Sequence, residues 1–209
     1  YWCKDILADW NIKSLKHIST KTISYGVIKL FEPDDDGVKI LRCSDVKEGY
    51  IDESNIRTIS RELSNEYSRT ILNKNDVVIN VRGTLGGCAV ISEKMKGFNV
   101  AREVAVISPD ANEFSSRFIM YSLLSKVFDN YRDYSLSGAI YVGLNMDTLS
   151  HYKMPYPCLK IQEKIADYLD ERSGNIDSLI AEKESLINDL EAYKKSLIYE
   201  VVTGKRRVV

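Results

Sequence analysis

The sequence predicts an α+β protein, in which a mostly β domain with flanking helices precedes a long C-terminal coiled-coil helix. Residues 10–156 contain short β-branched runs separated by turn residues, as strands of a folded domain do. From residue 159 to residue 203 the chain has one glycine, no proline and apolar residues at helical spacing. A chain of 209 residues with 44% hydrophobic residues is long enough for one domain and an extension. We therefore expect a domain over residues 1–157 and a helical region over residues 158–209.

Four runs in the first region are predicted to be strands because each is short, rich in β-branched residues and bounded by Gly, Asp, Asn or Ser. They span residues 38–43, 76–81, 88–91 and 103–107. The three glycines within residues 82–87 predict a tight loop with positive backbone angles. Residues 109–113 predict a helix start, with Asp or Asn as its cap. The helix is expected to continue through apolar positions three or four residues apart, at Phe114, Phe118, Tyr121, Leu124 and Phe128.

The C-terminal region is predicted to contain a short amphipathic helix, a weak point at Gly174, and then a long helix that ends at Gly204. Steps of three and four residues define a heptad seam in the long helix. Its positions are Ile176, Leu179, Lys183, Leu186, Leu190, Tyr193 and Leu197. A helix from residue 176 to residue 202 spans about 40 Å at 1.5 Å per residue. Since a helix of that length cannot fold back fully onto a domain of this size, we expect it to pair with another long helix.

Composition argues against several classes of protein. The 13 Tyr and 5 Phe argue against disorder, and no apolar run approaches the ~20 residues of a membrane span. The four cysteines, Cys3, Cys43, Cys88 and Cys158, lie far apart and lack a metal-binding spacing. They indicate free thiols in a reducing cytoplasm and no metal site. Because the first residue is Tyr1, we also expect that an upstream segment is missing from this sequence.

The C-terminal third resembles the helical spacer of type I restriction–modification specificity subunits. Residues 155–170 resemble the family segment pP-x-x-x-x-Q-x-x-I-A-x-x-L-D. The resemblance continues through residues 176–180 and closes with residues 199–205. It therefore extends over most of the predicted helical region, from residue 155 to residue 205.

The N-terminal region resembles a target-recognition domain of the same family more loosely. Residues 10–15 resemble its W-x-x-x-x-L start, and residues 76–86 resemble its D-I-L-x-x-x-x-G-x-x-G strand and loop. Residues 137–149 and the prolines after them resemble its end. The usual subunit has two recognition domains and two spacers, whereas this chain has one of each, so it is either a natural half-subunit or a fragment.

The resemblance implies a non-catalytic DNA-binding subunit that directs adenine methyltransferase and restriction subunits to a bipartite site. Its implied partners are double-stranded DNA, methyltransferase subunits and a translocating nuclease subunit, with no cofactor of its own. The net charge of −1 is unusual for a DNA-binding protein, because affinity for the duplex rests mainly on Lys and Arg. Partner subunits that supply phosphate contacts would explain this charge. With one spacer in the chain, a second copy paired antiparallel is the expected substitute for the other spacer.

Arg82, beside Gly83 and Thr84, is the first candidate for DNA contact. A guanidinium binds guanine or phosphate, and glycines let backbone N–H groups approach the duplex. Arg102 precedes a predicted strand and is a second candidate. The further candidates are Lys94, Lys96 and Tyr141. Tyr131 and Tyr134, near Tyr141 in sequence, could also approach the DNA backbone. The structural alternative for the loop is a β-turn with solvated basic side chains, and for Tyr131 and Tyr134 it is burial against a helix.

Two other functions stay open at the level of sequence. Pro33-Asp34 followed by Asp45-Val46-Lys47 satisfies the short PD…DxK pattern of metal-dependent nucleases, in which carboxylates and a lysine hold Mg²⁺ and activate water. The pattern is degenerate in a chain with 28% charged residues. A purely structural coiled-coil adaptor without a DNA role is the other alternative. No glycine-rich loop for S-adenosylmethionine and no methylation motif is found.

Overall fold

A computed structural model describes residues 9–29, 33–136 and 143–208. The chain divides into two compact units, Tyr1–Ala166 and Asp167–Val209. Each unit is described by itself below. The predicted α+β class with a long C-terminal helix is confirmed.

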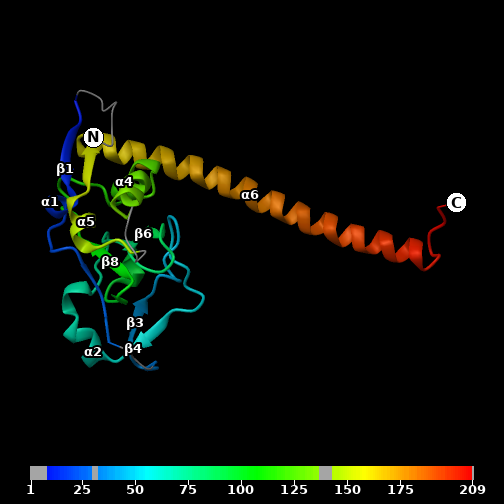
Figure 1. The fold of residues 1–209 in the computed structure, drawn as a ribbon, viewed down its shortest axis with the longest axis horizontal. Coiled ribbons are helices and arrows are strands. Elements are labelled where there is room, and N and C mark those ends of the chain that lie inside the picture. The colour runs from blue at the N-terminus through cyan, green and yellow to red at the C-terminus, as the bar shows by residue number, and fades with distance from the viewer. Residues whose placement is uncertain (1–8, 30–32, 137–142, 209) are drawn as a thin grey trace. The chain divides into compact units, whose positions relative to one another are not determined.

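A four-stranded antiparallel sheet forms the centre of the first unit (Figure 1). Its strands, in spatial order, are β2 (Ser24–Tyr25), β8 (Val104–Ile107), β5 (Val77–Asn80) and β6 (Cys88–Val90). In β5, Val77 and Ile79 face one hydrophobic core and Val78 faces another, because side chains alternate along a strand. The central strands are buried on both faces, which explains their unbroken apolar runs.

A second sheet joins β4 (Arg57–Ile59), β3 (Val38–Leu41) and β7 (Asn99–Val100), with β3 and β7 parallel. The strands β3 and β4 lie side by side in Figure 1. Next in the chain come α2 (Arg61–Glu66), whose first turn is capped by the Ser60 side chain, and a 3-10 helix, Ser68–Thr70. The buried side-chain amide of Asn99 donates to the carbonyl and hydroxyl oxygens of Ser64 at 3.2 and 3.1 Å, which ties α2 to β7. A further 3-10 helix, Glu93–Met95, lies between β6 and β7.

Short helices cover one face of the central sheet. They are α1 (Leu15–Ile18), α3 (Ser116–Leu123), α4 (Lys126–Leu136) and α5 (Met146–His151). The helix predicted from residues 109–113 begins later, at Ser116, because the Asp110 side chain accepts from the backbone of Asn112 and holds a local turn. The expected single helix is also divided at Leu124, after which the Ser125 hydroxyl accepts from the Phe128 N–H at 3.4 Å.

The two ends of the predicted recognition domain pair with each other. The strand β1 (Asn11–Ser14) runs antiparallel to β9 (Lys153–Tyr156), with Asn11 opposite Tyr156. Lys13 of β1 forms an ion pair with Glu113 at 2.7 Å, and the Tyr156 hydroxyl donates to the same carboxylate at 3.1 Å. This two-stranded ribbon therefore joins segments from near the two ends of the first unit.

Gln162 anchors the start of α6 (Leu159–Val202) within the first unit. Its side chain is completely buried, and its amide donates to the carbonyls of Glu113 and Pro157 at 3.0 and 2.9 Å. Its amide oxygen accepts from the Ser115 N–H at 3.0 Å. The glutamine of the spacer motif is thus a fully bonded attachment point.

The second unit is the remainder of α6 and the residues after it. The helix continues through the predicted weak point at Gly174, so the short helix and the long helix expected on either side are one helix, α6, of 44 residues. A single glycine costs only about 1 kcal/mol in a helix interior, and no proline adds to it. The predicted end is confirmed, since Gly204 has a positive φ of 73° and its N–H bonds to the Val201 carbonyl. No helix in the described ranges is both long and apolar enough to cross a membrane.

Candidate nucleic-acid interface

Arg82 and Arg102 lie at the same end of the central sheet. Arg82 follows β5 and Arg102 precedes β8, and these strands are antiparallel neighbours. The backbone N–H of Arg82 bonds to the Glu103 carbonyl at 3.3 Å, and that of Arg102 bonds to the Val27 carbonyl, beyond β2, at 2.9 Å. Three connections of the sheet therefore converge at this end, which we call the loop end (residues 25–27, 82–87 and 102–103).

The two arginines differ in their electrostatic surroundings. The exposed Arg82 guanidinium lies 5.5 Å from the centroid of the Tyr25 ring, and among the described residues it has no acidic partner. Arg102 is also exposed but lies 3.3 Å from the carboxylate of Glu103. A cation held against an aromatic face keeps its donors available for an external acceptor. Arg82 is therefore the better prepared of the two for an anionic or guanine ligand.

Glycines give the loop after Arg82 its shape. Gly83 and Gly86 have positive φ values of 73° and 102°, which L residues with side chains rarely adopt. Gly87 is needed for another reason: a Cβ there would lie 2.2 Å from the Val46 carbonyl oxygen. The predicted tight loop is confirmed, and Gly83 and Thr84 are exposed on it.

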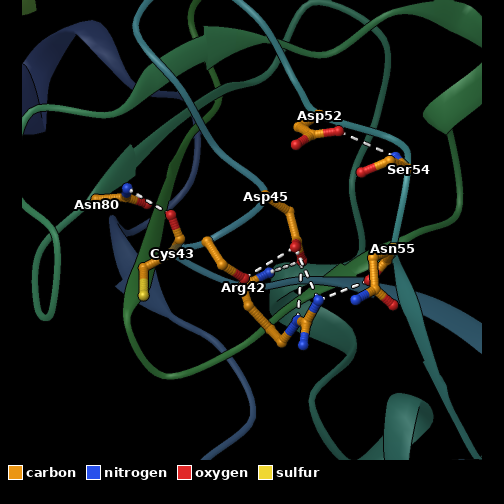
Figure 2. A network of polar contacts seen from close by, with 8 residues as sticks. Arg42, Cys43, Asp45, Asp52, Ser54, Asn55 and Asn80 are labelled. Atoms are coloured by element: carbon orange, nitrogen blue, oxygen red, sulfur yellow. Dashed lines mark hydrogen bonds and ion pairs between the residues drawn. The ribbon is translucent and has the colours of Figure 1, made fainter. Parts of the chain in front are cut away.

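Asn80, the last residue of β5, joins this loop to residues 42–46. Figure 2 shows its amide nitrogen directed at the carbonyl oxygen of Cys43, 3.0 Å away. The same nitrogen lies 3.1 Å from the carbonyl oxygen of Val46 and 3.0 Å from that of Thr84. Only 2% of Asn80 is exposed, so these bonds are shielded from water.

Asp45 serves the loop structure and not a metal site. Figure 2 shows the Arg42 guanidinium against both carboxylate oxygens of Asp45, at 3.0 and 2.8 Å. The Arg42 N–H and the Ser44 hydroxyl donate to the same carboxylate, and Arg42 also reaches the carbonyl oxygen of Asn55 at 2.6 Å. Asp45 is only 4% exposed, so its bonding capacity is already used within the loop.

The nuclease pattern is not assembled. Asp34 precedes β3 and Asp45 follows it, so the two carboxylates lie at opposite ends of that strand. Within the described ranges, no three His, Cys, Asp or Glu side chains gather where they could hold a metal ion. Cys43, Cys88 and Cys158 are unpaired thiols, and burial raises the pKa of the Cys88 thiol.

Comparison with known proteins gives the family. Residues 8–191 match the family model described as "Type I restriction modification DNA specificity domain". The chain belongs to this family. The specificity subunit of the EcoBI type I restriction enzyme of Escherichia coli is 25% identical over 94% of this chain and 42% of its own length. The MjaVIII specificity subunit of Methanocaldococcus jannaschii is 26% identical over 98% of this chain and 48% of its own length. The chain thus spans less than half the length of these curated relatives.

Solved structures of the same family share the fold. One, described as showing complex assembly and conformational transition of the type I R-M system, superposes with a TM-score of 0.67 at 15% identity. The superposition covers 94% of this chain and 46% of the solved chain. The HsdS subunit of Thermoanaerobacter tengcongensis superposes with a TM-score of 0.57 at 17% identity, over 84% of this chain and 40% of that one.

The lysines predicted to contact DNA do not lie at the loop end of this specificity domain. Lys94 and Lys96 follow β6 and lie at the other end of the β5–β6 hairpin from Arg82. Lys94 forms an ion pair with Glu53, whereas Lys96 is exposed and has no acidic partner in the described part of the chain. The fold therefore brings Arg82 and Arg102 together and leaves both lysines apart from them.

The predicted tyrosines have separate outcomes. Tyr141 lies outside the described residues. Tyr131 is part-buried against the Tyr152 ring, 5.1 Å between centroids, and its hydroxyl donates to the Thr148 carbonyl at 2.9 Å. This arrangement matches the packing alternative for Tyr131.

The seam residues of α6 face solvent within the second unit. Ile176, Leu179, Leu186, Leu190 and Tyr193 are each 50–59% exposed, and Leu197 is part-exposed. Ile180, Ile187 and Ile198 add further exposed apolar area to the stripe. An apolar stripe of this length is characteristic of a helix that pairs with a partner.

Sequence reasoning missed three residues that build the loop end. Tyr25 supports Arg82, Asn80 joins two loops, and Arg42 fixes the second of these loops through Asp45. Only Asn80 carried a usable signal, because an amide at the end of a buried apolar strand requires hydrogen-bond partners.

Proposed function

We propose that this chain is a specificity subunit, or half-subunit, of a type I restriction–modification system, and that it recognises one half of a bipartite DNA site. The family match supports this role. The single structural observation that supports it best is Arg82, an exposed guanidinium beside a glycine-rich loop with no acidic partner among the described residues. Such a group donates to guanine in the major groove or to phosphate.

The proposed DNA contacts fall into two sets. Arg82, Gly83, Thr84 and Arg102 contact base edges and the adjacent phosphates from the loop end. Lys94 and Lys96, at the other end of the hairpin, contribute phosphate contacts at most, and Tyr141 belongs to the interface as a backbone contact. The duplex is therefore recognised mainly at the loop end.

The chain itself catalyses no reaction in this proposal. Methyltransferase subunits dock on it and methylate adenine, and a translocating nuclease subunit joins them for restriction. These partners supply part of the phosphate contact, which fits a net charge of −1. The exposed seam of α6 pairs antiparallel with the same helix of a second copy, so that two recognition domains are held at a fixed separation.

The role of the loop end is tested with Arg82→Ala and Arg102→Ala in the complex assembled with its methyltransferase subunits. Loss of a bidentate base contact should weaken cognate binding by about 1–3 kcal/mol and relax one position of the site. Loss of a phosphate contact should weaken binding to all sequences and reduce the salt dependence.

Arg61→Ala is the matched control. Arg61 is exposed and is the first residue of α2. It follows Ile59 of β4, which pairs with the first residue of β3, whereas the loop end lies towards the last residue of β3. The Arg61→Ala substitution removes the same charge as the loop-end variants and should leave cognate binding unchanged. Wild-type binding by both loop-end variants across several salt concentrations would place the recognition surface elsewhere.

A further inference from the structure

We propose that residues 42–50 form the second half of the DNA-recognition surface, and that Tyr50 is a specificity-determining contact on it. The inference rests on the proposed function and names an element that the sequence did not indicate. We call residues 42–50 the second loop. Its position, rigidity and exposed tip are independent observations.

The position of the second loop is set by the loop end. Asn80 holds the carbonyls of Cys43 and Val46 together with that of Thr84 on the Arg82 loop. Because one side-chain amide bonds to both loops, neither can shift without breaking buried hydrogen bonds. The second loop therefore faces the same ligand as Arg82.

Towards its tip, the second loop is held by the first residue of β6. The Cys88 N–H bonds to the Lys47 carbonyl at 3.0 Å, and the Gly49 N–H bonds to the Cys88 carbonyl at 2.9 Å. The loops approach so closely at Gly87 that a Cβ there would lie 2.2 Å from the Val46 carbonyl oxygen. A cavity of about 140 Å³ remains between them, lined in part by Ser44, Glu48 and Thr84.

Internal bonds make the second loop rigid. The bidentate Arg42–Asp45 pair closes its first turn, and Figure 2 shows Arg42 also bonded to Asn55. At the tip, the Lys47 N–H bonds to the Tyr50 carbonyl at 2.9 Å, and Gly49 takes a positive φ of 88°. A rigid loop positions its side chains with little loss of entropy on binding.

Tyr50 is the exposed group that this rigid frame presents. It is 60% exposed although its ring is large and apolar. Adjacent Lys47 and Glu48 carry opposite charges, so the tip adds little net attraction for phosphate. A tyrosine in this position contributes an apolar surface for a thymine methyl group and a hydroxyl for a base edge. The chemistry fits sequence recognition better than general affinity.

The test is Tyr50→Ala in the assembled complex, with binding measured on cognate and unrelated duplexes at several salt concentrations. We expect cognate affinity to fall about tenfold, with unchanged affinity for unrelated DNA and an unchanged salt slope. Methyltransferase binding, measured by the mass of the complex, should also stay unchanged. Tyr50→Phe keeps the ring and should recover most of the loss if the apolar contact dominates.

A second pair of variants tests the junction between the loops. Gly87→Ala forces the second loop away from the Arg82 loop and should reduce cognate discrimination with Arg82 in place. Gly37→Ala is the matched control, because a Cβ at Gly37 would lie equally close, 2.2 Å, to a backbone carbonyl oxygen, that of Ile59. Gly37 precedes β3 and is therefore at the other end of that strand from the second loop. It should cost similar stability, measured by thermal unfolding, without changing discrimination among the folded molecules.

The outcomes separate this inference from the proposed function. If Tyr50→Ala leaves cognate binding unchanged while Arg82→Ala weakens it, the recognition role of the second loop is wrong and the proposed function stands. Loss of methyltransferase binding with Tyr50→Ala makes the tip a protein-docking surface and also overturns the inference. Absence of any sequence preference in the wild-type complex contradicts the proposed function itself.

Discussion

Arg82, the proposed DNA contact, is positioned by a residue distant in sequence. Its guanidinium lies over the Tyr25 ring, which comes from a different strand of the sheet. A cation–π contact at an exposed site is worth about 0.5–1 kcal/mol. Its larger effect is to restrict a flexible side chain before the ligand arrives.

Tyr25→Leu should therefore weaken cognate DNA binding by about 0.5–1 kcal/mol, because Arg82 loses its aromatic support. Tyr25→Phe retains the ring and should bind like the wild type. In the Arg82→Ala background, Tyr25→Leu should have no further effect on the dissociation constant. Equal losses in both backgrounds would mean that Tyr25 acts independently of Arg82.

The Lys13–Glu113 pair gives the first unit a defined pH dependence. The hydrogen bond between the two side chains lowers the pKa of the Glu113 carboxyl and raises the pKa of Lys13, and the Tyr156 hydroxyl lowers the pKa of Glu113 further. The side chain of Glu113 is 43% exposed and that of Lys13 is 30% exposed, so solvent screens their interaction and it is worth less than about 1 kcal/mol.

A carboxyl whose pKa is lowered on folding stabilises the fold above its unfolded pKa, near 4.5 for Glu113, and loses this contribution as pH falls through the folded value. The free energy of unfolding should thus be higher for wild type than for Glu113→Gln at pH 7. The difference should disappear in acid, below pH 4.5. Denaturant unfolding of both proteins across this range measures it, and a gap that stays constant into acid would show that ionisation of Glu113 is not its cause.

At the scale of the element, α6 combines two different kinds of helix surface. Near its start, Gln162 and Ala166 are completely buried within the first unit. Beyond that point the apolar side chains of the seam are exposed. Burying each large apolar side chain is worth about 1.5–3 kcal/mol, so a partner helix gains substantially from the seam.

Leu186→Glu combined with Leu190→Glu should therefore convert a self-associated wild-type chain into a monomer. Light scattering at micromolar concentration measures the mass, and circular dichroism verifies that the first unit stays folded. Glu184→Ala with Glu191→Ala, on exposed polar positions of the same helix, is the control and should not change the mass. A wild-type chain that is monomeric both alone and with the methyltransferase contradicts the helix pair.

At the scale of the whole molecule, the chain holds one recognition domain and one long helix. It spans less than half of its curated relatives. A two-fold pair is self-complementary, so two copies paired as proposed would present identical recognition surfaces in inverted orientation. The helices between them would set a fixed gap in the DNA site.

The methylated DNA motif should thus be a split palindrome, with two identical half-sites in inverted orientation around a spacer of constant length. Sequencing of modified adenines in cells that express this chain with its methyltransferase reveals the motif. Two unrelated half-sites would instead show that a different recognition domain completes the subunit.

Much of the fold could be predicted because its signals are local. The β-branched runs became β3, β5, β6 and β8, and the glycines of residues 82–87 formed the expected loop. The short strands β1, β2, β4, β7 and β9 were missed, because their residues form strands only when paired with other segments of the chain. The weak point expected at Gly174 does not divide α6, since neighbouring helical residues outweigh one glycine.

The candidate site was predicted only in part. Arg82 was identified from its glycine-rich surroundings, but its proximity to Tyr25 and Arg102 depends on strand order. Lys94 was grouped with Arg82 because the two are close in sequence, and the β5–β6 hairpin places them at opposite ends. Because β6 runs away from the loop that contains Arg82, the residues that follow β6 lie at the opposite end of the hairpin, although they are close to Arg82 in sequence.

Local sequence patterns were enough to predict the long helix, the principal strands, the shape of the Arg82 loop and the family, because each depends on a residue's nearest neighbours or on a continuous motif. Which loops share one end of the sheet depends instead on tertiary contacts. The order β2-β8-β5-β6 places the connections beside Tyr25, Arg82 and Arg102 together, and buried Asn80 adds the second loop. Such pairing arises from hydrogen bonds and packing between segments far apart in the chain, and no local pattern records it.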